Sequence, residues 1–355
     1  MIDLNDAYAI RERDPHEMFQ HIAGLADQCE AAWQDAGKVN LPESFRQVSQ
    51  VVIAGMGGSA IGGALMASLA APRGGIPIHI ARDYRLPGFA SGPSTLVIAS
   101  SYSGNTEETL SAFKQARERG CQLLAIASGG TIGEMARQFD APLMHVPYPS
   151  QPRAALGYSF VPLIAFGSRL GWIDDQSAHL KEATAVMRAW NAELRLDSPV
   201  VKNLAKRMAG QIMGRFAIVY GAGAFAEVAR RWKGQINENG KHFAAFEALP
   251  EADHNALLGS TYPDDMAGRL KVIFLTGSSD HPRNAARVEA TREILMLQGC
   301  DTDILTARGD SPLAQMLSMI QFGDWISGYL GVLNGADPSD TELLLSFKKR
   351  MAEIG

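Results

Sequence analysis

Five short runs of mainly apolar residues, with helix-like stretches between most of them, are the feature that most constrains the fold of this chain. They lie at residues 51–54, 76–80, 95–99, 123–127 and 143–146. A run that is apolar on both sides, instead of alternating with polar residues, is typical of a strand buried on both faces. Such strands alternating with helices predict an α/β fold with a doubly wound parallel sheet and flanking helices.

The same pattern begins again in the second half of the chain. Residues 216–223 repeat the strand-to-glycine pattern of 51–57, and residues 272–279 repeat that of 97–103, each about 170 residues later. We therefore predict two similar doubly wound domains, the second without the most polar loop of the first. The expected division is an N-terminal helical segment 1–45, a first domain 46–190 and a second domain 191–355, with a polar helical connector at 174–197.

Composition and charge exclude several classes of function. The net charge is −5 with no long basic run, which argues against nucleic acid as a partner. No apolar run is long enough to span a membrane and the N-terminus is polar, so we expect no membrane span and a cytoplasmic protein. The three cysteines form no CxxC pair, so neither a zinc site nor a disulfide framework is expected.

A glycine-rich turn follows the first predicted strand, with the sequence GMGGSAIGG at residues 55–63. Glycines allow a tight turn with uncovered backbone N–H groups, and a helix beginning near Ser59 would add partial positive charge, which together favour an anion. The spacing also fits a dinucleotide-binding turn. Asp83, after the second strand, keeps that alternative open.

A second loop, SSYSGNTEET at residues 100–109, is more specific because it gathers four hydroxyl groups around one glycine. They belong to Ser101, Tyr102, Ser103 and Thr106. Hydroxyls at the carboxyl end of a strand and the start of a helix suit a phosphate monoester. Helix capping is the alternative interpretation, but capping requires one such residue and not four.

Several charged residues further along the chain allow either a chemical or a structural interpretation. Glu238 lies in an amide- and glycine-rich stretch, 235–240, which we expect to be a turn, where it can act as a base or pair with a neighbouring cation. His254 has polar neighbours and can move a proton at neutral pH or lie unused in a surface loop, and His242 is a nearby competitor. Arg153 can stabilise an oxyanion or form a salt bridge.

The motifs together resemble a known family. The two loops resemble those of the sugar isomerase (SIS) domain, a doubly wound sheet that binds phosphosugars and usually occurs in pairs. The segments QPRAALGY at 151–158, WKGQINENGK at 232–241 and LPEADHN at 249–255 are similar to the bifunctional phosphoglucose/phosphomannose isomerases, and the likeness extends over nearly the whole chain. It implies reversible conversion of glucose 6-phosphate, and of mannose 6-phosphate, to fructose 6-phosphate without metal or cofactor.

The resemblance also implies a role for individual residues. Glu238 would be the base that moves a proton between C2 and C1, Arg153 would stabilise the enediolate, and His254 would open the sugar ring across a homodimer interface. On the closing helix, Thr341 would line the pocket and leave room for both C2 epimers, and Lys348 would assist ring opening unless it is only a helix-terminal charge. The expected phosphate-binding residues are Gly57, Gly58, Ser59, Ser101, Ser103 and Thr106.

Some positions depart from the family, and rival functions stay open. Asp253 and Ala256 stand where the family tends to have asparagine and glutamate, and a tryptophan often found after them is absent. The main rival is a non-catalytic regulatory protein that binds a phosphosugar through its SIS domains. The isomerase half of an amidotransferase and a nicotinamide-dependent dehydrogenase are less compatible with the sequence, because no cysteine follows Met1 and the second loop is rich in hydroxyls.

Overall fold

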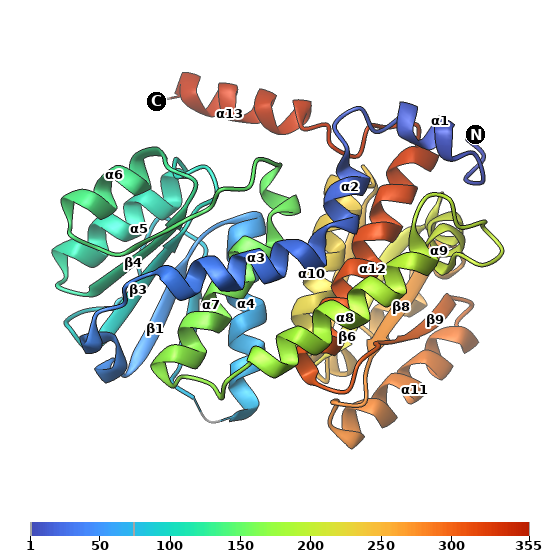
Figure 1. Ribbon diagram of the computed structural model, residues 1–355. Helices are drawn as coiled ribbons and strands as arrows, with labels where there is room; N and C mark the ends of the chain where they lie inside the picture. The colour runs from blue at the N-terminus through green and yellow to red at the C-terminus, as the bar shows by residue number, and fades with distance from the viewer. Residues whose placement is uncertain (1, 74, 355) are drawn as a thin grey trace.

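A computed structural model describes residues 2–73 and 75–354 and contains two parallel sheets joined through a layer of helices (Figure 1). The first sheet has the order β2-β1-β3-β4-β5, and the second has the order β7-β6-β8-β9. The first-sheet strands are β1 (Gln50–Ala54), β2 (Ile78–Ala81), β3 (Thr95–Ser100), β4 (Gln122–Ala127) and β5 (Leu143–His145). The second-sheet strands are β6 (Phe216–Ala222), β7 (Ala244–Leu249), β8 (Leu270–Thr276) and β9 (Asp301–Thr306).

Helices flank both sheets. Those of the first half are α1 (Ala7–Glu12), α2 (Met18–Ala23), α3 (Leu25–Lys38), α4 (Gly57–Ala70), α5 (Glu107–Glu118), α6 (Gly130–Gln138) and α7 (Leu156–Leu170). Those of the second half are α8 (Ser177–Leu194), α9 (Leu204–Ile212), α10 (Ala224–Glu238), α11 (Pro282–Leu297), α12 (Pro312–Leu333) and α13 (Glu342–Ile354). The 3₁₀ turns are η1 (Glu43–Gln47), η2 (Ala71–Arg73), η3 (Pro152–Ala154), η4 (Glu251–His254), η5 (Leu258–Thr261) and η6 (Ala267–Arg269).

The arrangement confirms the expected α/β class with two doubly wound parallel sheets. Every pairing within each sheet is parallel. In both sheets the chain passes from the first strand to one side and then crosses to the other, so a switch point lies between β1 and β3 and a second lies between β6 and β8. Ligands of open parallel sheets bind at such points, beyond the carboxyl ends of the strands.

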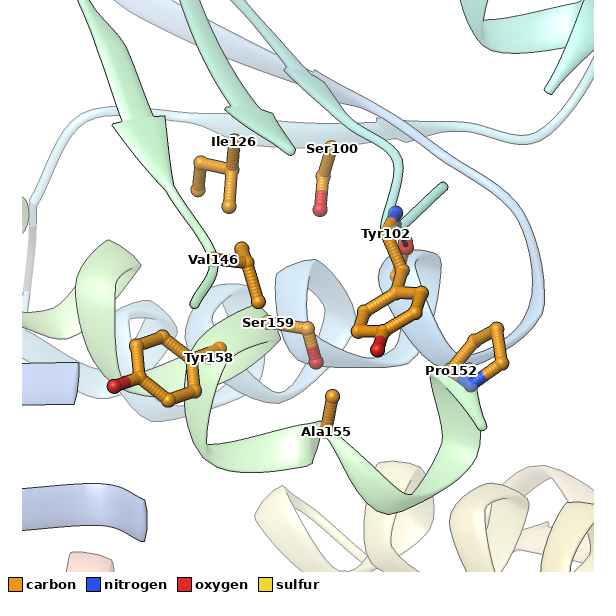
Figure 2. Close-up of a pocket in the computed structure, with 9 residues that line it drawn as sticks. Ser100, Tyr102, Ile126, Val146, Pro152, Ala155, Tyr158 and Ser159 are labelled. Atoms are coloured by element: carbon orange, nitrogen blue, oxygen red, sulfur yellow. Dashed lines mark hydrogen bonds between the residues drawn. The ribbon is translucent and has the colours of Figure 1, made fainter. Parts of the chain in front are cut away.

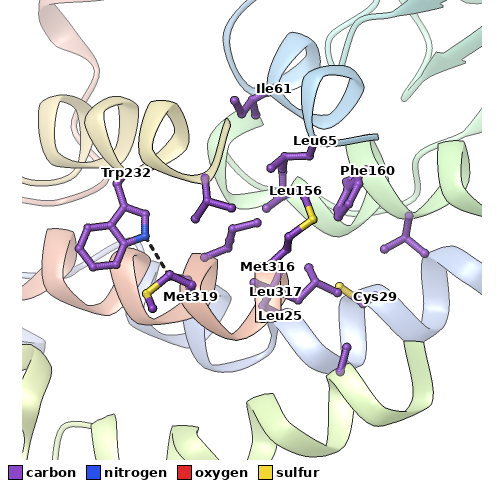
Figure 3. Close-up of a cluster of buried hydrophobic side chains, with 14 of the residues drawn as sticks. Leu25, Cys29, Ile61, Leu65, Leu156, Phe160, Trp232, Met316, Leu317 and Met319 are labelled. Atoms are coloured by element: carbon purple, nitrogen blue, oxygen red, sulfur yellow. Dashed lines mark hydrogen bonds between the residues drawn. The ribbon is translucent and has the colours of Figure 1, made fainter. Parts of the chain in front are cut away.

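One continuous core joins the two halves. Helix α12 is apolar around most of its circumference and almost wholly buried, and it packs against α8, α9 and α10, while α10 also packs against α4 of the first half. Figure 3 shows this junction, where Leu65 and Leu156 lie near Met316, and Trp232 lies beside Met319. Burial of each large apolar side chain contributes about 1.5–3 kcal/mol. We infer that the two sheets are held in a fixed relation, which a site between them requires.

The observed elements differ from the expected ones in a few places. Strand β2 begins at Ile78 instead of residue 76, since Pro77 has no N–H for the ladder, although its carbonyl still accepts a bond from Val51 N. The connector is helix α8, within the expected 174–197. The division of the chain into domains at residues 45 and 190 stays a prediction.

Candidate active site

The first loop, residues 55–59, needs glycine at two positions because other backbone segments lie against it. A Cβ on Gly55 would lie 2.7 Å from the Ser100 carbonyl oxygen, and a Cβ on Gly58 would lie 2.9 Å from that of Pro152. Gly57 has a φ of +49°, which favours glycine, and it begins helix α4. The loop therefore presents the amino end of a helix at the switch point of the first sheet, where an anion is favoured.

The second loop connects β3 to α5 and lies against the first. The backbone N–H of Tyr102 donates to Ser59 Oγ at 3.2 Å, so one hydrogen bond joins the two loops. Ser101 Oγ lies 3.0 Å from Thr106 Oγ1, so the Thr106 side chain bonds within the loop although it stands at the capping position of α5. These two hydroxyls and that of Ser103 lie within one loop of six residues, as the phosphate-binding interpretation requires.

The Tyr102 hydroxyl has a different role from the other three. It donates to the Tyr148 carbonyl oxygen at 2.6 Å and accepts from Ser150 N at 2.7 Å. Tyr102 therefore ties the loop to the segment that leads into η3. The sequence counted its hydroxyl among the four of this loop without placing Tyr102 among the expected phosphate-binding residues, and these two bonds occupy that hydroxyl.

Beneath the loops lies a narrow pocket with room for about one water molecule (Figure 2). The side chains of Ser100 and Ser159 point into it beside Tyr102 and Val146. Within the described residues, Ser100 Oγ has no hydrogen-bond partner although it is buried. This space is too small for a sugar.

Arg153 lies in η3, directly against the first loop. A Cβ on Gly58 would be 3.2 Å from Arg153 N, so the two backbones touch. The side chain is only 2% exposed, and burial lowers the pKa of its guanidinium while the Glu238 carboxylate opposes that change. Nε donates to Asn239 Oδ1 at 2.6 Å and Nη2 donates to the Pro338 carbonyl oxygen at 2.8 Å.

Glu238 is the last residue of α10, so the expectation of a turn at 235–240 was wrong for its first four residues. The apolar face of α10 packs against α12 and carries the helix further than the glycines suggested. Oε2 lies 3.5 Å from Arg153 Nη1, a long contact, and the side chain is 36% exposed. The carboxylate is thus beside a cation and still accessible.

His254 is exposed in η4, which follows the carboxyl end of β7. Its neighbour Asp253 turns inward, where it pairs with Arg287 at 2.7 Å and accepts a bond from Thr291 at 2.7 Å. The unusual aspartate therefore fixes the loop to α11 and leaves the histidine outside. The competitor His242 is occupied, because its Nε2 donates to the Arg215 carbonyl oxygen at 2.5 Å.

The C-terminal residues stand in two different situations. Thr341 is half-buried and follows Pro338, whose carbonyl oxygen accepts from Arg153, by three residues. Lys348 is exposed on α13, a helix that buries none of its described residues and extends away from the body of the molecule (Figure 1). The structure brings the Thr341 segment to the site and does not bring Lys348 there.

Sequence reasoning missed the residues that hold Arg153. Asn239 is fully buried behind its guanidinium, and the buried pair Arg231–Asp324, at 2.9 Å, supports its backbone. Lys241 donates from Nζ to the Glu238 and Pro338 carbonyl oxygens, at 2.5 and 3.2 Å. Asn239 and Lys241 belong to the same motif as Glu238, residues 232–241, and that shared motif was the only sequence feature that pointed to them. Asp324 is the lone acidic residue of the apolar helix α12, which is the pattern expected of an acid paired with a buried cation.

At the switch point of the second sheet, a side chain occupies the loop that corresponds to residues 100–109 of the first sheet. Gln315 of α12 accepts from Ser279 N at 3.1 Å and Ser279 Oγ at 2.8 Å, and donates to Ser278 Oγ at 2.6 Å. The amide thus takes the place that a ligand oxygen would have. The two sheets therefore differ: within the described residues, an amide from another helix bonds the two hydroxyls of the second loop, whereas Ser101 and Thr106 of the first loop bond each other.

The described residues were also compared with the requirements of a metal site and of a membrane span. Across residues 2–73 and 75–354, no three side chains of His, Cys, Asp or Glu are grouped so that they could hold a metal ion. In the same part of the chain, no helix combines the length and apolar character needed to cross a membrane.

Comparison with known proteins gives consistent matches. Residues 201–351 match the family described as bacterial phospho-glucose isomerase C-terminal SIS domain. The chain is 37% identical to a bifunctional phosphoglucose/phosphomannose isomerase of Caldicellulosiruptor bescii, over 95% of this chain and 99% of the relative. It is 34% identical to the protein of the same name from Aquifex aeolicus, over 94% and 98%.

A solved structure supports the fold. The C-terminal domain of glucosamine-fructose-6-phosphate aminotransferase from Francisella tularensis superimposes with a TM-score of 0.73, covering 91% of this chain and 98% of that one. Because the sequence identity is only 13%, this likeness concerns the arrangement of two SIS sheets and not the reaction.

Proposed function

The chain belongs to the family of bifunctional phosphoglucose/phosphomannose isomerases, and from this premise we propose that it converts glucose 6-phosphate and mannose 6-phosphate reversibly to fructose 6-phosphate. The observation that carries the proposal is the placement of Glu238. An accessible carboxylate stands beside the buried Arg153, and Arg153 lies against the phosphate loop through Gly58.

The phosphate is proposed to bind where the two loops meet. Gly57, Gly58 and Ser59 open helix α4, and Ser101, Ser103 and Thr106 precede α5, so backbone dipoles and hydroxyls converge on one anion. No large positive field is needed, which agrees with the net charge of −5. The bond between Tyr102 N and Ser59 Oγ keeps the loops in register before substrate arrives.

The proton transfer is assigned to Glu238. Once the ring is open, the carboxylate takes the proton from C2 to give a cis-enediolate. The hydroxyl proton passes from O2 to O1, and the carboxylate then returns its proton to C1. Arg153 Nη1 points towards the Glu238 side of the site, so it would stabilise the negative oxygens that develop there. The contact of 3.5 Å between the two groups is loose, which leaves the carboxylate free to face the substrate.

Ring opening is assigned to His254 of a second copy in a homodimer. The histidine is exposed and its loop is anchored through Asp253, so it is available to a partner. Thr341 would line the sugar pocket, and Lys348 would assist only if α13 moves from its present position. The cytoplasm is the compartment we propose.

A non-catalytic phosphosugar sensor is the rival function. Such a protein needs the phosphate loops but has no use for a carboxylate beside a buried arginine, so the pair Glu238–Arg153 favours the enzyme.

A coupled assay tests the proposal. Fructose 6-phosphate formation is measured from each aldose phosphate, with chelator present, for wild type, Glu238→Gln and the surface control Glu289→Gln. We expect turnover of both substrates by wild type and the control, and a loss of at least about 100-fold in Glu238→Gln. A wild type that binds both sugar phosphates without turnover would support the sensor instead.

A further inference from the structure

Two uncharged groups, from separate segments of the chain, bind the Arg153 guanidinium. Nε and Nη2 are bound by the Asn239 side chain and the Pro338 carbonyl oxygen. Both acceptors are uncharged, so they fix the plane of the guanidinium without cancelling its charge. Nη1 is left facing Glu238 at 3.5 Å. One edge of the charged Arg153 guanidinium therefore faces the Glu238 carboxylate.

The orientation of the Asn239 amide follows from the network behind it. The Asp324 carbonyl oxygen is only an acceptor, so the Ser327 hydroxyl, 2.7 Å away, must donate to it. Ser327 Oγ therefore accepts from Asn239, whose Nδ2 lies 3.1 Å away. With Nδ2 committed to Ser327, only Oδ1 can face Arg153 Nε. A flipped amide would place two donors against each other at 2.6 Å.

The backbone of Arg153 is fixed by the same face of helix α12. Arg231 Nη2 donates to the Arg153 carbonyl oxygen at 2.8 Å and pairs with Asp324 at 2.9 Å. Asp324 and Ser327 are one helical turn apart, so a single turn of α12 determines both the position of Arg153 and the direction of its side chain.

We propose that Asn239, oriented by Ser327, is a positioning residue that aims Arg153 at the oxygens of the enediolate. The inference rests on the proposed isomerase function and adds to it a group that does not touch the substrate. An amide suits this position because an aspartate of the same shape would pair with Arg153 and draw its charge away from the reacting oxygens.

Four proteins test the assignment: wild type, Asn239→Asp, Ser327→Ala and, as conservative rescue, Ser327→Thr. For each, kcat and KM are measured together with affinity for two probes. Inorganic phosphate reports on the loops alone. An aldonic acid phosphate one carbon shorter than the substrate, whose planar carboxylate imitates the enediolate oxygens, reports on Arg153 as well.

We expect kcat to fall about 10- to 100-fold in Asn239→Asp, with KM and phosphate affinity little changed. The affinity for the aldonate phosphate should fall by a similar factor. Ser327→Ala should show a smaller loss of the same kind, and Ser327→Thr should restore wild-type values. Equal losses of affinity for both probes, or unchanged kcat and aldonate affinity in Asn239→Asp, would overturn the assignment. If wild type turns over neither sugar, the isomerase proposal fails, whereas the ratio of the two affinities still decides the role of Asn239.

Discussion

Gly58 provides a sharp test of how the first loop, residues 55–59, is coupled to Arg153. A Cβ at this position would lie 2.9 Å from the Pro152 carbonyl oxygen, about 0.5 Å short of the 3.4 Å at which ordinary contact begins, and 3.2 Å from Arg153 N. All of these are backbone atoms, so no flexible side chain can turn aside. In Gly58→Ala the η3 turn must therefore recede, and it must take Arg153 with it.

The size of the effect follows from that displacement. Overpacking of a close contact costs about 1–3 kcal/mol of folding free energy. A catalytic group displaced by a substantial fraction of an ångström loses about 10- to 100-fold in rate. We expect Gly58→Ala to lower kcat/KM for glucose 6-phosphate by that factor and to lower the free energy of unfolding by about 1–3 kcal/mol.

The assays are steady-state kinetics and urea unfolding, with Gly210→Ala as the matched control. Gly210 lies inside helix α9 and a Cβ there meets nothing within 4 Å, so this variant should keep its activity and gain about 0.5–1 kcal/mol of stability. Full activity in Gly58→Ala would refute the idea that the loop and Arg153 form one rigid unit.

Three further predictions concern other parts of the chain. Gln315→Ala should lower the free energy of unfolding by about 1–3 kcal/mol in urea, because Ser279 N and its hydroxyl lose their acceptor, while kcat stays unchanged. Burial raises the pKa of Asp280 from 3.8 to about 6, so the folded state binds more protons than the unfolded state between these values and stability falls as pH rises through them. After allowance for solvent screening of this half-buried group, wild type should lose about 1 kcal/mol more than Asp280→Asn between pH 4 and pH 6.5 in urea unfolding, and an equal loss in both proteins would contradict the assignment. Mixing and refolding inactive Glu238→Gln with inactive His254→Ala should restore about a quarter of wild-type activity if the histidine acts across a dimer, and none if both residues serve the same subunit's site.

The fold was largely predictable because its signal is local. Fully apolar strands such as 95–99 and the repeated strand-to-glycine turns are properties of a few consecutive residues. From them both parallel sheets and the two loops at the first switch point were predicted. The prediction of a turn at 235–240 was wrong for 235–238 because packing against α12, a tertiary contact, extends α10 to Glu238.

The support of the site was not predictable because it is assembled from distant segments. The Arg153 guanidinium depends on Asn239 and Pro338, and its backbone depends on Arg231 and Asp324. Each of the three groups bonded directly to Arg153 lies at least 78 residues from it along the chain, so no motif spacing links them to it. The same applies to Gln315, whose amide fills the second loop from another helix. The individual roles given to Glu238, His254 and Lys348 stay predictions.

Isomerisation in D₂O, followed by NMR, tests the role of Glu238 most directly. A carboxylate that carries a proton between C2 and C1 exchanges part of it with solvent, so fructose 6-phosphate made by wild type from glucose 6-phosphate should carry deuterium at C1. Glu238→Gln should bind the sugar phosphate and introduce no deuterium over the same period. Complete conversion by wild type without any deuterium, or deuterium uptake at the wild-type rate in Glu238→Gln, would contradict proton transfer by this carboxylate.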